Sequence, residues 1–211
     1  MDRELELTYD NDLINFTDRY YTSGVNIVYS RLVNKNSHFY NSFGSKKSDS
    51  SKLIYRVHYG HRIYTSKEIK EKDVEQFDRP YAGWHYLNFD LINFPKPEVS
   101  NKYSLDIGMV GEMSGIGAFH TWWHRGVGIT TPRGWEYQIA NEVLVNFKYN
   151  RVKNWHLGKK IKFITNSSVS VGNRENRLEQ ELVVRIGKFN EFMNTSYMNS
   201  RVADFIPELG Y

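Results

Sequence analysis

The chain has 211 residues, a net charge of +4 and no cysteine. That length suits one sizeable domain, and the lack of cysteine excludes disulfide scaffolds, zinc–thiolate sites and cysteine nucleophiles. The positive charge is small and spread along the chain, so we expect no nucleic-acid partner. The mean hydropathy is −0.61, and no apolar run approaches the roughly 18 residues that a transmembrane helix needs.

Alternation of apolar and polar residues dominates the chain, and this period of two predicts antiparallel strands. The clearest case lies between Glu142 and Asn150, where Val143, Val145 and Phe147 alternate with polar residues. About nine strands are predicted. In chain order they are Glu4–Tyr9, Val25–Val33, Leu53–Tyr59, Trp84–Phe94, Tyr103–Val110, 142–150, Ile161–Val171, Glu179–Ile186 and one near Arg201–Tyr211.

The connections between these strands differ in length and carry the only helical patterns. Helical periodicity is limited to Lys67–Gln76 and Ala118–Arg125. Alternate connections of an up-and-down sheet lie at the same end, so the long ones after the first, third and fifth strands should share one rim. These long connections are 10–24, 63–82 and 111–141. The other rim has the short connections Pro95–Asn101 and Asn154–Lys159, and the longer polar one at 34–52.

Two architectures fit alternating strands with little helix. In a soluble sandwich or barrel, the apolar face of each strand forms the core. In an outer-membrane barrel the apolar face meets lipid, polar residues face the lumen, and aromatic residues mark the interfaces. Soluble domains are commoner, but the aromatic content of 15% and the polar face of 142–150 favour the membrane barrel. We then expect Val143, Val145 and Phe147 to face outward, and Asn146 and Lys148 to face inward.

Asn11 and Asp12 open the first long connection and offer oxygen ligands to a hard cation such as calcium. The alternative is a role in the turn, because Asn and Asp side chains bond to nearby backbone groups. The segment Asp10–Tyr21 does not match an EF-hand loop, since it lacks the mid-loop glycine and the final glutamate.

His124, in the third long connection, is a candidate general base because histidine titrates near neutrality. The alternative is an ordinary surface or lumen histidine, one of seven in the chain. His120 lies four residues earlier and would share a helix face with it, but the intervening Thr-Trp-Trp is unlike a zinc-protease motif. Ser114 does not lie in a nucleophile-elbow motif and no serine adjoins His124, so a water nucleophile is preferred over an acyl-enzyme.

Arg79 lies in Asp78–Gly83, which closes the second long connection. Its proline and glycine are typical of a rigid turn before a strand. The other interpretation is an arginine that recognises a phosphate or carboxylate at the same rim.

In this order and spacing, several motifs resemble the LpxR-type lipid A 3′-O-deacylase family of Gram-negative outer membranes. They span roughly residues 5–145 and comprise Asn11-Asp12, Thr17–Gly24, Asp78–Gly83, Asp106–Gly111, His124 and Gly134–Glu142. The resemblance implies a twelve-stranded up-and-down outer-membrane barrel, a calcium-dependent site near the outer-leaflet rim, and hydrolysis of the ester that holds the 3′-linked acyloxyacyl group of lipid A.

Residue by residue, the resemblance places His124 on the family's catalytic histidine and Asp12 on its essential aspartate, which would also bind the metal. Asn11 and Thr22 fall on accompanying polar site residues. A glutamate that some members carry a few residues after the histidine has no counterpart in Gly128–Thr131, so its supporting role is not carried over. Arg79 and Arg125 are candidates for binding the glucosamine phosphates of lipopolysaccharide.

We therefore expect a single all-β domain over 1–211 in the outer membrane, a monomer, with a short helix around His124. About nine strands of twelve would leave open edges, and the start at Met1-Asp2-Arg3-Glu4 lacks a secretory pattern. We thus expect the parent gene to encode an export signal and further strands. The rival functions are a non-catalytic barrel, acting as a pore or surface-binding module, and a phospholipase, whose usual serine after the histidine is missing.

Overall fold

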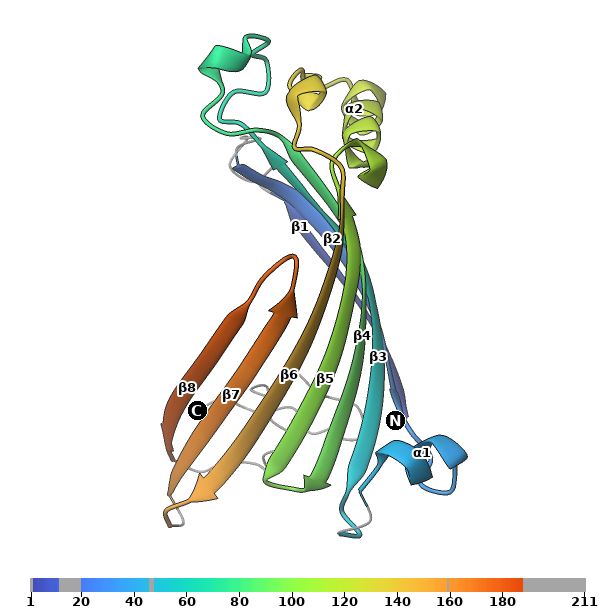
Figure 1. Ribbon diagram of the computed structural model, residues 1–211, viewed down its shortest axis with the longest axis vertical. Helices are drawn as coiled ribbons and strands as arrows, with labels where there is room; N and C mark the ends of the chain where they lie inside the picture. Colours follow the sequence, from blue (N-terminus) through green and yellow to red (C-terminus); the bar gives the residue numbers. More distant parts are fainter. Residues whose placement is uncertain (1, 12–19, 46–47, 159, 188–211) are drawn as a thin grey trace.

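The computed structural model describes residues 2–11, 20–45, 48–158 and 160–187, which contain one antiparallel sheet of eight strands (Figure 1). In chain order the strands are β1 (Arg3–Asn11), β2 (Tyr20–Leu32), β3 (Lys52–Thr65), β4 (Ala82–Lys96), β5 (Val99–Val110), β6 (Glu142–His156), β7 (Ile161–Gly172) and β8 (Arg177–Ile186). Each strand pairs with its neighbours in sequence, which confirms the predicted up-and-down topology. The strand expected near Arg201–Tyr211 lies outside the described residues.

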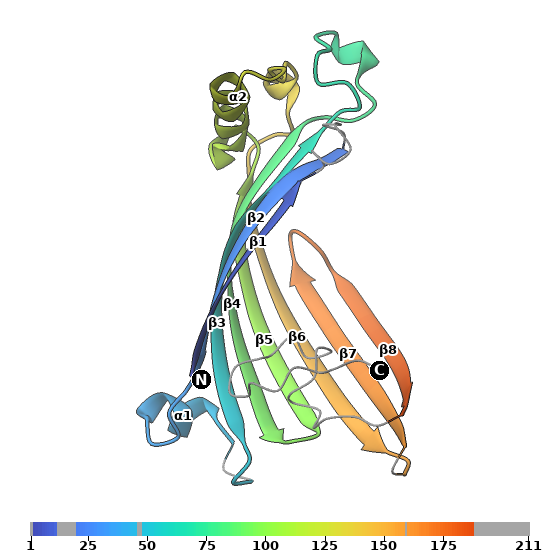
Figure 2. The ribbon, with the colours of Figure 1, turned by 180° about the vertical axis from the view of Figure 1, so that it is seen from behind.

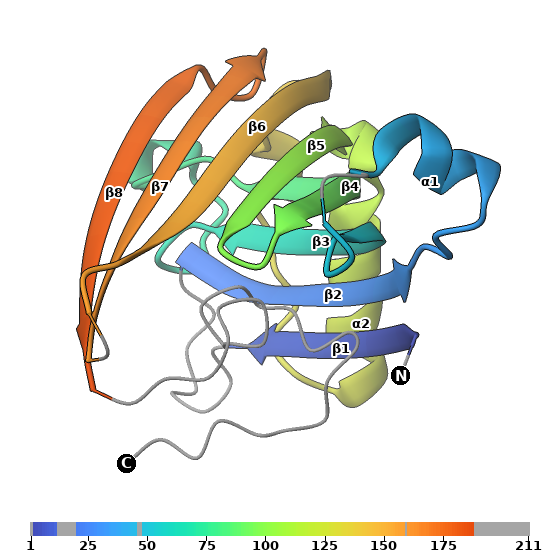
Figure 3. The same ribbon diagram turned by 90° about the horizontal axis from the view of Figure 1, so that it is seen from below.

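The sheet is curved (Figure 3). Its two faces have the polarity of an outer-membrane barrel wall. On β6, the side chains of Val143, Val145 and Phe147 are 51%, 46% and 48% exposed, while Asn146 is 1% exposed. Lys148 shares the face of Asn146 and pairs with Glu179 of β8 at 3.6 Å. The predicted orientation of this strand is confirmed. The same outward alternation exposes Leu5, Leu7, Ile27, Tyr59, Phe89, Tyr103, Leu105, Ile107, Leu182 and Val184.

The concave face carries polar side chains that bond to one another across strands. Asn88 on β4 donates a hydrogen bond to Asp106 on β5, and Arg174 pairs with the same carboxylate at 3.2 Å. The guanidinium of Arg174 lies 5.3 Å from the Trp84 ring, and that of Arg62 lies 5.3 Å from it as well. Paired charges and stacked rings are what a buried polar surface requires, because an isolated charge there would be costly.

The described residues form two small aliphatic and aromatic clusters on the concave face near the short-turn end. Ile54, Ile92 and Phe94 form one of them, and Val152 with Ile164 forms the other. No helix in the described part of the chain is both long and apolar enough to cross a membrane.

The connections 66–81 and 111–141 lie at one rim, as predicted, where β1 also ends and β2 begins (Figure 1). The opposite rim carries the short turns between β4 and β5 and between β6 and β7, and the longer connection between β2 and β3. Helix α1 (His38–Phe43) lies in the connection between β2 and β3, on the short-turn side. Helix α2 (Ile116–Val127) lies at the other end and confirms the helix expected at Ala118–Arg125. The short helices η3 (Glu112–Ser114) and η4 (Trp135–Tyr137) flank it in sequence.

The helix predicted over Lys67–Gln76 is wrong. Only its last three residues are helical, as the single turn η2 (Val74–Gln76). Before it, the Glu71 carboxylate accepts bonds from the backbone N–H groups of Lys72 and Asp73. Such local bonds from a side chain compete with the helical ones and favour a turn.

Candidate functional site

Helix α2 is held against the outer face of the sheet, over the upper ends of β3 and β4. The ring of Phe119 lies 5.5 Å from that of His61 on β3. On β4, a Cβ at Gly83 would lie 2.5 Å from the Cβ of Ile116, so only glycine lets the helix approach this closely. Glycines in the left-handed conformation bound the helix, Gly115 before it and Gly128 after it.

His124 sits in the last turn of α2 and is 3% exposed. Its Nδ1 bonds to the backbone carbonyl of Thr130, just beyond the helix. A carbonyl oxygen can only accept a hydrogen bond, so Nδ1 must carry the proton. In the neutral ring the lone pair is then on Nε2, which makes Nε2 the atom that can accept a proton.

His120 packs against His124 one turn earlier on the helix. The two rings are 4.3 Å apart at 84°, and the His120 ring lies 5.7 Å from Trp135 at 89°. Neither ring nitrogen of His120 has a hydrogen-bond partner among the described residues. Burial, followed by the nearby His124, lowers the pKa of His120 to about 3. His120 is therefore neutral near pH 7 and acts as packing beside His124.

The second and third long connections dock on each other beside α2. Tyr81 is fully buried, and its ring lies 5.1 Å from Trp135 at 71°. The backbone N–H of Ile139 donates to the carbonyl of Tyr81, and that of Arg133 donates to Ile69. The two connections thus form one platform that fixes the position of the helix.

Asn11 and Thr22 lie together at the same rim, on β1 and β2. Asn11 is the register partner of Ser23, the residue after Thr22. The register of β2 with β3 shifts at Thr22, a β-bulge position, and the Thr22 hydroxyl is 3.0 Å from that of Thr65. Bulges are common beside active sites because they redirect side chains. Asp12, expected as catalytic and metal-binding, lies outside the described residues.

Arg79 stands at the rim with its guanidinium 4.1 Å from the ring centre of Tyr20. Its neighbour Asp78 accepts hydrogen bonds from the Lys67 amide at 3.0 Å and the Ser66 hydroxyl at 2.7 Å. Those two bonds lower the pKa of Asp78 to about 2. Asp78 is thus an anchor of the loop. Arg125, the other arginine expected to bind phosphate, is exposed on α2.

Two features of this site have no signature in the sequence. One is the backbone carbonyl of Thr130, which orients His124. It lies in Gly128–Thr131, the segment that has no counterpart of the glutamate expected from the family resemblance. Any residue type can provide a backbone carbonyl that orients a histidine, so no particular side chain in the sequence predicts this contact. The other is the Tyr81–Trp135 contact, which joins loops 54 positions apart.

A calcium ion would need oxygen ligands at this rim. The Nδ2 of Asn11 donates to the Tyr9 hydroxyl at 2.9 Å, so its carbonyl oxygen is the atom suited to face a cation. The Asn11 carbonyl oxygen and the Thr22 hydroxyl oxygen are hard ligands of the kind that calcium prefers. Among the described residues there is no group of three histidine, cysteine, aspartate or glutamate side chains that could hold a metal.

Comparisons with known proteins match this chain to one protein family and to a solved structure of the same fold. The family model described as "Outer membrane protein LpxR" matches residues 1–207. A solved structure titled "LpxR from Salmonella typhimurium" superposes with a TM-score of 0.58 at 21% identity, covering 79% of this chain and 53% of that one. At this identity the likeness establishes the fold, and the chain spans about half the length of that protein. A search of curated proteins found no match.

Proposed function

Because this chain belongs to the LpxR family of outer membrane proteins, we propose that the protein is a lipid A deacylase, a carboxylic ester hydrolase that removes the 3′-linked acyloxyacyl group. It is an outer-membrane protein, and its apolar outward face is the surface that meets lipid. Its substrate would be the lipid A part of lipopolysaccharide in the outer leaflet.

The observation that carries this proposal is the hydrogen bond between Nδ1 of His124 and the carbonyl of Thr130. It fixes the tautomer and the orientation of the ring, as the orienting partner of a catalytic histidine does. His120 packs against His124, and Trp135 packs against His120, so the His124 ring has a fixed neighbour on the helix. A fixed ring with a basic Nε2 is what general-base catalysis needs.

In the proposed reaction, Nε2 of His124 takes a proton from a water molecule as the water oxygen attacks the ester carbonyl carbon. The tetrahedral intermediate then collapses, and the bond between that carbon and the 3′ oxygen of the sugar breaks. The imidazolium of His124 returns the proton to the departing 3′ oxygen. The products are a free fatty acid and a sugar hydroxyl, and the histidine is regenerated.

Asp12, Asn11 and Thr22 would hold the calcium ion or orient the ester beside His124. When bound, calcium supplies positive charge to an ester oxygen that becomes negative in the transition state. Arg79 and Arg125 would engage the glucosamine phosphates, because guanidinium groups match phosphate oxygens.

The location of α2 supports a substrate that stays in the membrane. The helix lies on the outer side of the strands, so an embedded acyl chain reaches the site without crossing the wall. Phe119, Trp122 and Trp123 are exposed on it. Large aromatic side chains of this kind favour the boundary between lipid and water.

Mass spectrometry of lipid A from cells with and without the full-length protein tests the proposal. We expect the species lacking the 3′ acyloxyacyl group only when the protein is present. An unchanged lipid A profile would reject the deacylase and favour the non-catalytic barrel. Loss of phospholipid acyl chains instead would favour the phospholipase.

A further inference from the structure

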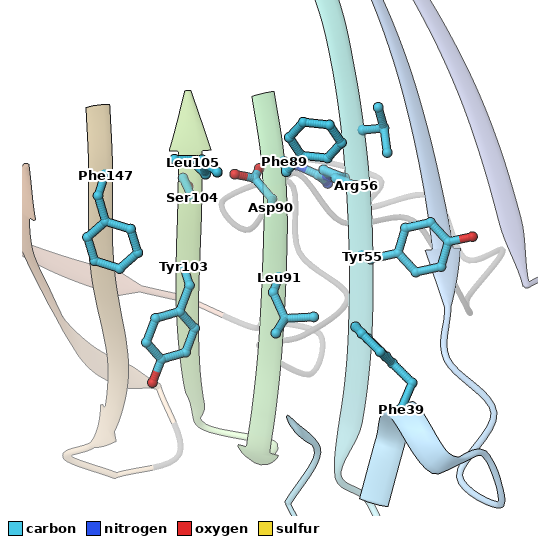
Figure 4. Close-up of a pocket in the computed structure, with 11 residues that line it drawn as sticks. Phe39, Tyr55, Arg56, Phe89, Asp90, Leu91, Tyr103, Ser104, Leu105 and Phe147 are labelled. Carbon is cyan, nitrogen blue, oxygen red and sulfur yellow. The ribbon is translucent and has the colours of Figure 1, made fainter. Parts of the chain in front are cut away.

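A groove lies on the outward face of the sheet at the end opposite to α2. It has a volume of about 460 Å³, which is within the range of small-ligand sites. Figure 4 shows its lining, which comes from β3 to β6 and from α1. The apolar residues that line it include Phe39, Tyr55, Phe89, Leu91, Tyr103 and Phe147. Arg56, Asp90 and Ser104 also line it, but they are register partners on positions that alternate to the concave face. The outward side chains of the groove are therefore those of a hydrocarbon site.

Helix α1 forms a ledge at one end of this groove, outside the sheet (Figure 2). Tyr40 is buried and bonds to the Ser51 hydroxyl at 2.6 Å, while the Asn93 amide donates to the carbonyl of Phe43 at 3.1 Å. Phe39 and Phe43 remain exposed with their rings 5.0 Å apart. The ledge is thus fixed to the strands and presents two aromatic rings to the surroundings, as interfacial helices do.

Two arginines lie beside the groove on the same outward face. Arg3 and Arg31 are direct register partners on β1 and β2, and both are exposed. Like charges directly opposite each other in a sheet are destabilising. An anion bound between the two guanidinium groups would offset their repulsion. Their outward-facing register neighbours are Leu5, Tyr29 and Tyr55, none of which is acidic.

The arginine pair and the groove belong to one row of the sheet. Arg31 pairs with Tyr55, which pairs with Leu91, and Leu91 pairs with Tyr103. Neighbouring strands are about 4.8 Å apart, so the Arg31 guanidinium is within reach of the Tyr55 side of the groove. An anionic head at the arginines and a hydrocarbon chain in the groove would therefore belong to one molecule.

We propose that this groove binds a phospholipid with a net negative headgroup, with one acyl chain in the groove and the phosphate at Arg31 and Arg3. The occupant is a lipid of the leaflet opposite to the one that holds lipid A, an assignment of leaflets that rests on the proposed function. The site is separate from His124, and lipid bound there anchors the α1 end of the sheet.

Native mass spectrometry of the full-length protein in detergent, with added phosphatidylglycerol, tests the proposal. We expect one saturable adduct, and affinity about tenfold lower for phosphatidylcholine, a difference of about 1.4 kcal/mol. The double variant Arg3→Gln/Arg31→Gln should bind phosphatidylglycerol about tenfold more weakly and should lose the preference over phosphatidylcholine. Phe39→Ala should lower the affinity for both lipids by the same factor, because it removes an apolar contact with the acyl chain and no charge.

The matched control is Arg133→Gln at the opposite rim, which removes an exposed positive charge and keeps the backbone N–H that bonds to Ile69. It should leave the affinity for both lipids unchanged. Heat-modifiable gel mobility checks that every variant is folded. Equal binding of the two lipids by the wild type, unchanged binding in the double variant, or tighter binding of purified lipid A would overturn the proposal. Deacylation assays on the same samples keep the two proposals apart, because a protein without esterase activity can still show the lipid preference.

Discussion

Replacing Asn146 with alanine tests how the polar concave face holds the β7–β8 hairpin. Its carboxamide donates to the Ser170 hydroxyl at 2.8 Å and to the carbonyl of Glu175 at 3.0 Å. Its oxygen accepts from the backbone N–H groups of Arg174 at 3.1 Å and Glu175 at 3.0 Å. All the hydrogen-bonding capacity of this amide is thus used by one hairpin.

The expected loss follows from these bonds. Each hydrogen bond contributes about 1 kcal/mol net, so the four together contribute about 4 kcal/mol. The hairpin turn is only partly buried, and water replaces some of them in the variant. We therefore expect Asn146→Ala to lower the free energy of unfolding by about 2–4 kcal/mol.

Urea unfolding of the full-length protein in micelles, read by tryptophan fluorescence, measures this loss. The matched control is Asn150→Ala, on the same strand and the same face. Asn150 bonds through Nδ2 to Asn166 and, at 3.5 Å, to the carbonyl of Ser167, so its loss should be about 1 kcal/mol. If Asn146→Ala costs no more than this control, the hairpin does not depend on the amide and the reasoning is wrong.

Further predictions concern α2. Gly83→Ala places a methyl 2.5 Å from the Cβ of Ile116, so it should displace the helix. The deacylation rate should fall at least about tenfold, which is a barrier increase of about 1.4 kcal/mol. The heat-modifiable gel mobility should stay normal, because the barrel itself still folds. The pKa of His120 is about 3 in the folded protein and near 6.5 in the unfolded chain. The stability that neutral His120 gives to the helix is therefore fully present above pH 6.5 and declines as the pH falls toward 3. The decline is at most about 1.4 kcal/mol per pH unit. The protection factor of the α2 amides, which is the intrinsic exchange rate at each pH divided by the observed rate, should therefore fall on acidification in the wild type and much less in His120→Phe. An equal fall in both proteins would reject this.

Much of the fold could be predicted from the sequence because the strands obey a local rule. The alternation around Val145 and Asn146 fixes which side chains face lipid, and strand parity puts the long connections on one rim. The prediction for β3 ended at Tyr59, whereas the strand runs to Thr65. Past Gly60 the outward position holds His61, which packs under Phe119 of α2, so the apolar signal stops where the helix covers the sheet.

The candidate site was only partly accessible from the sequence. The rim position of Asn11, Thr22 and His124 follows from strand parity. The contacts that orient His124 do not, because they depend on the carbonyl of Thr130 and on two loops meeting at Tyr81. Such long-range contacts leave no periodic pattern.

The most direct test of the account is the initial rate of lipid A deacylation by purified full-length wild type and His124→Ala, with calcium present and after chelation. We expect folded His124→Ala to be slower by at least about 10²-fold, because general-base catalysis typically contributes that much or more. Chelation should abolish wild-type activity, and added calcium should restore it. Wild-type rates in correctly folded His124→Ala would eliminate His124 as the base, and chelator-insensitive activity would eliminate the metal.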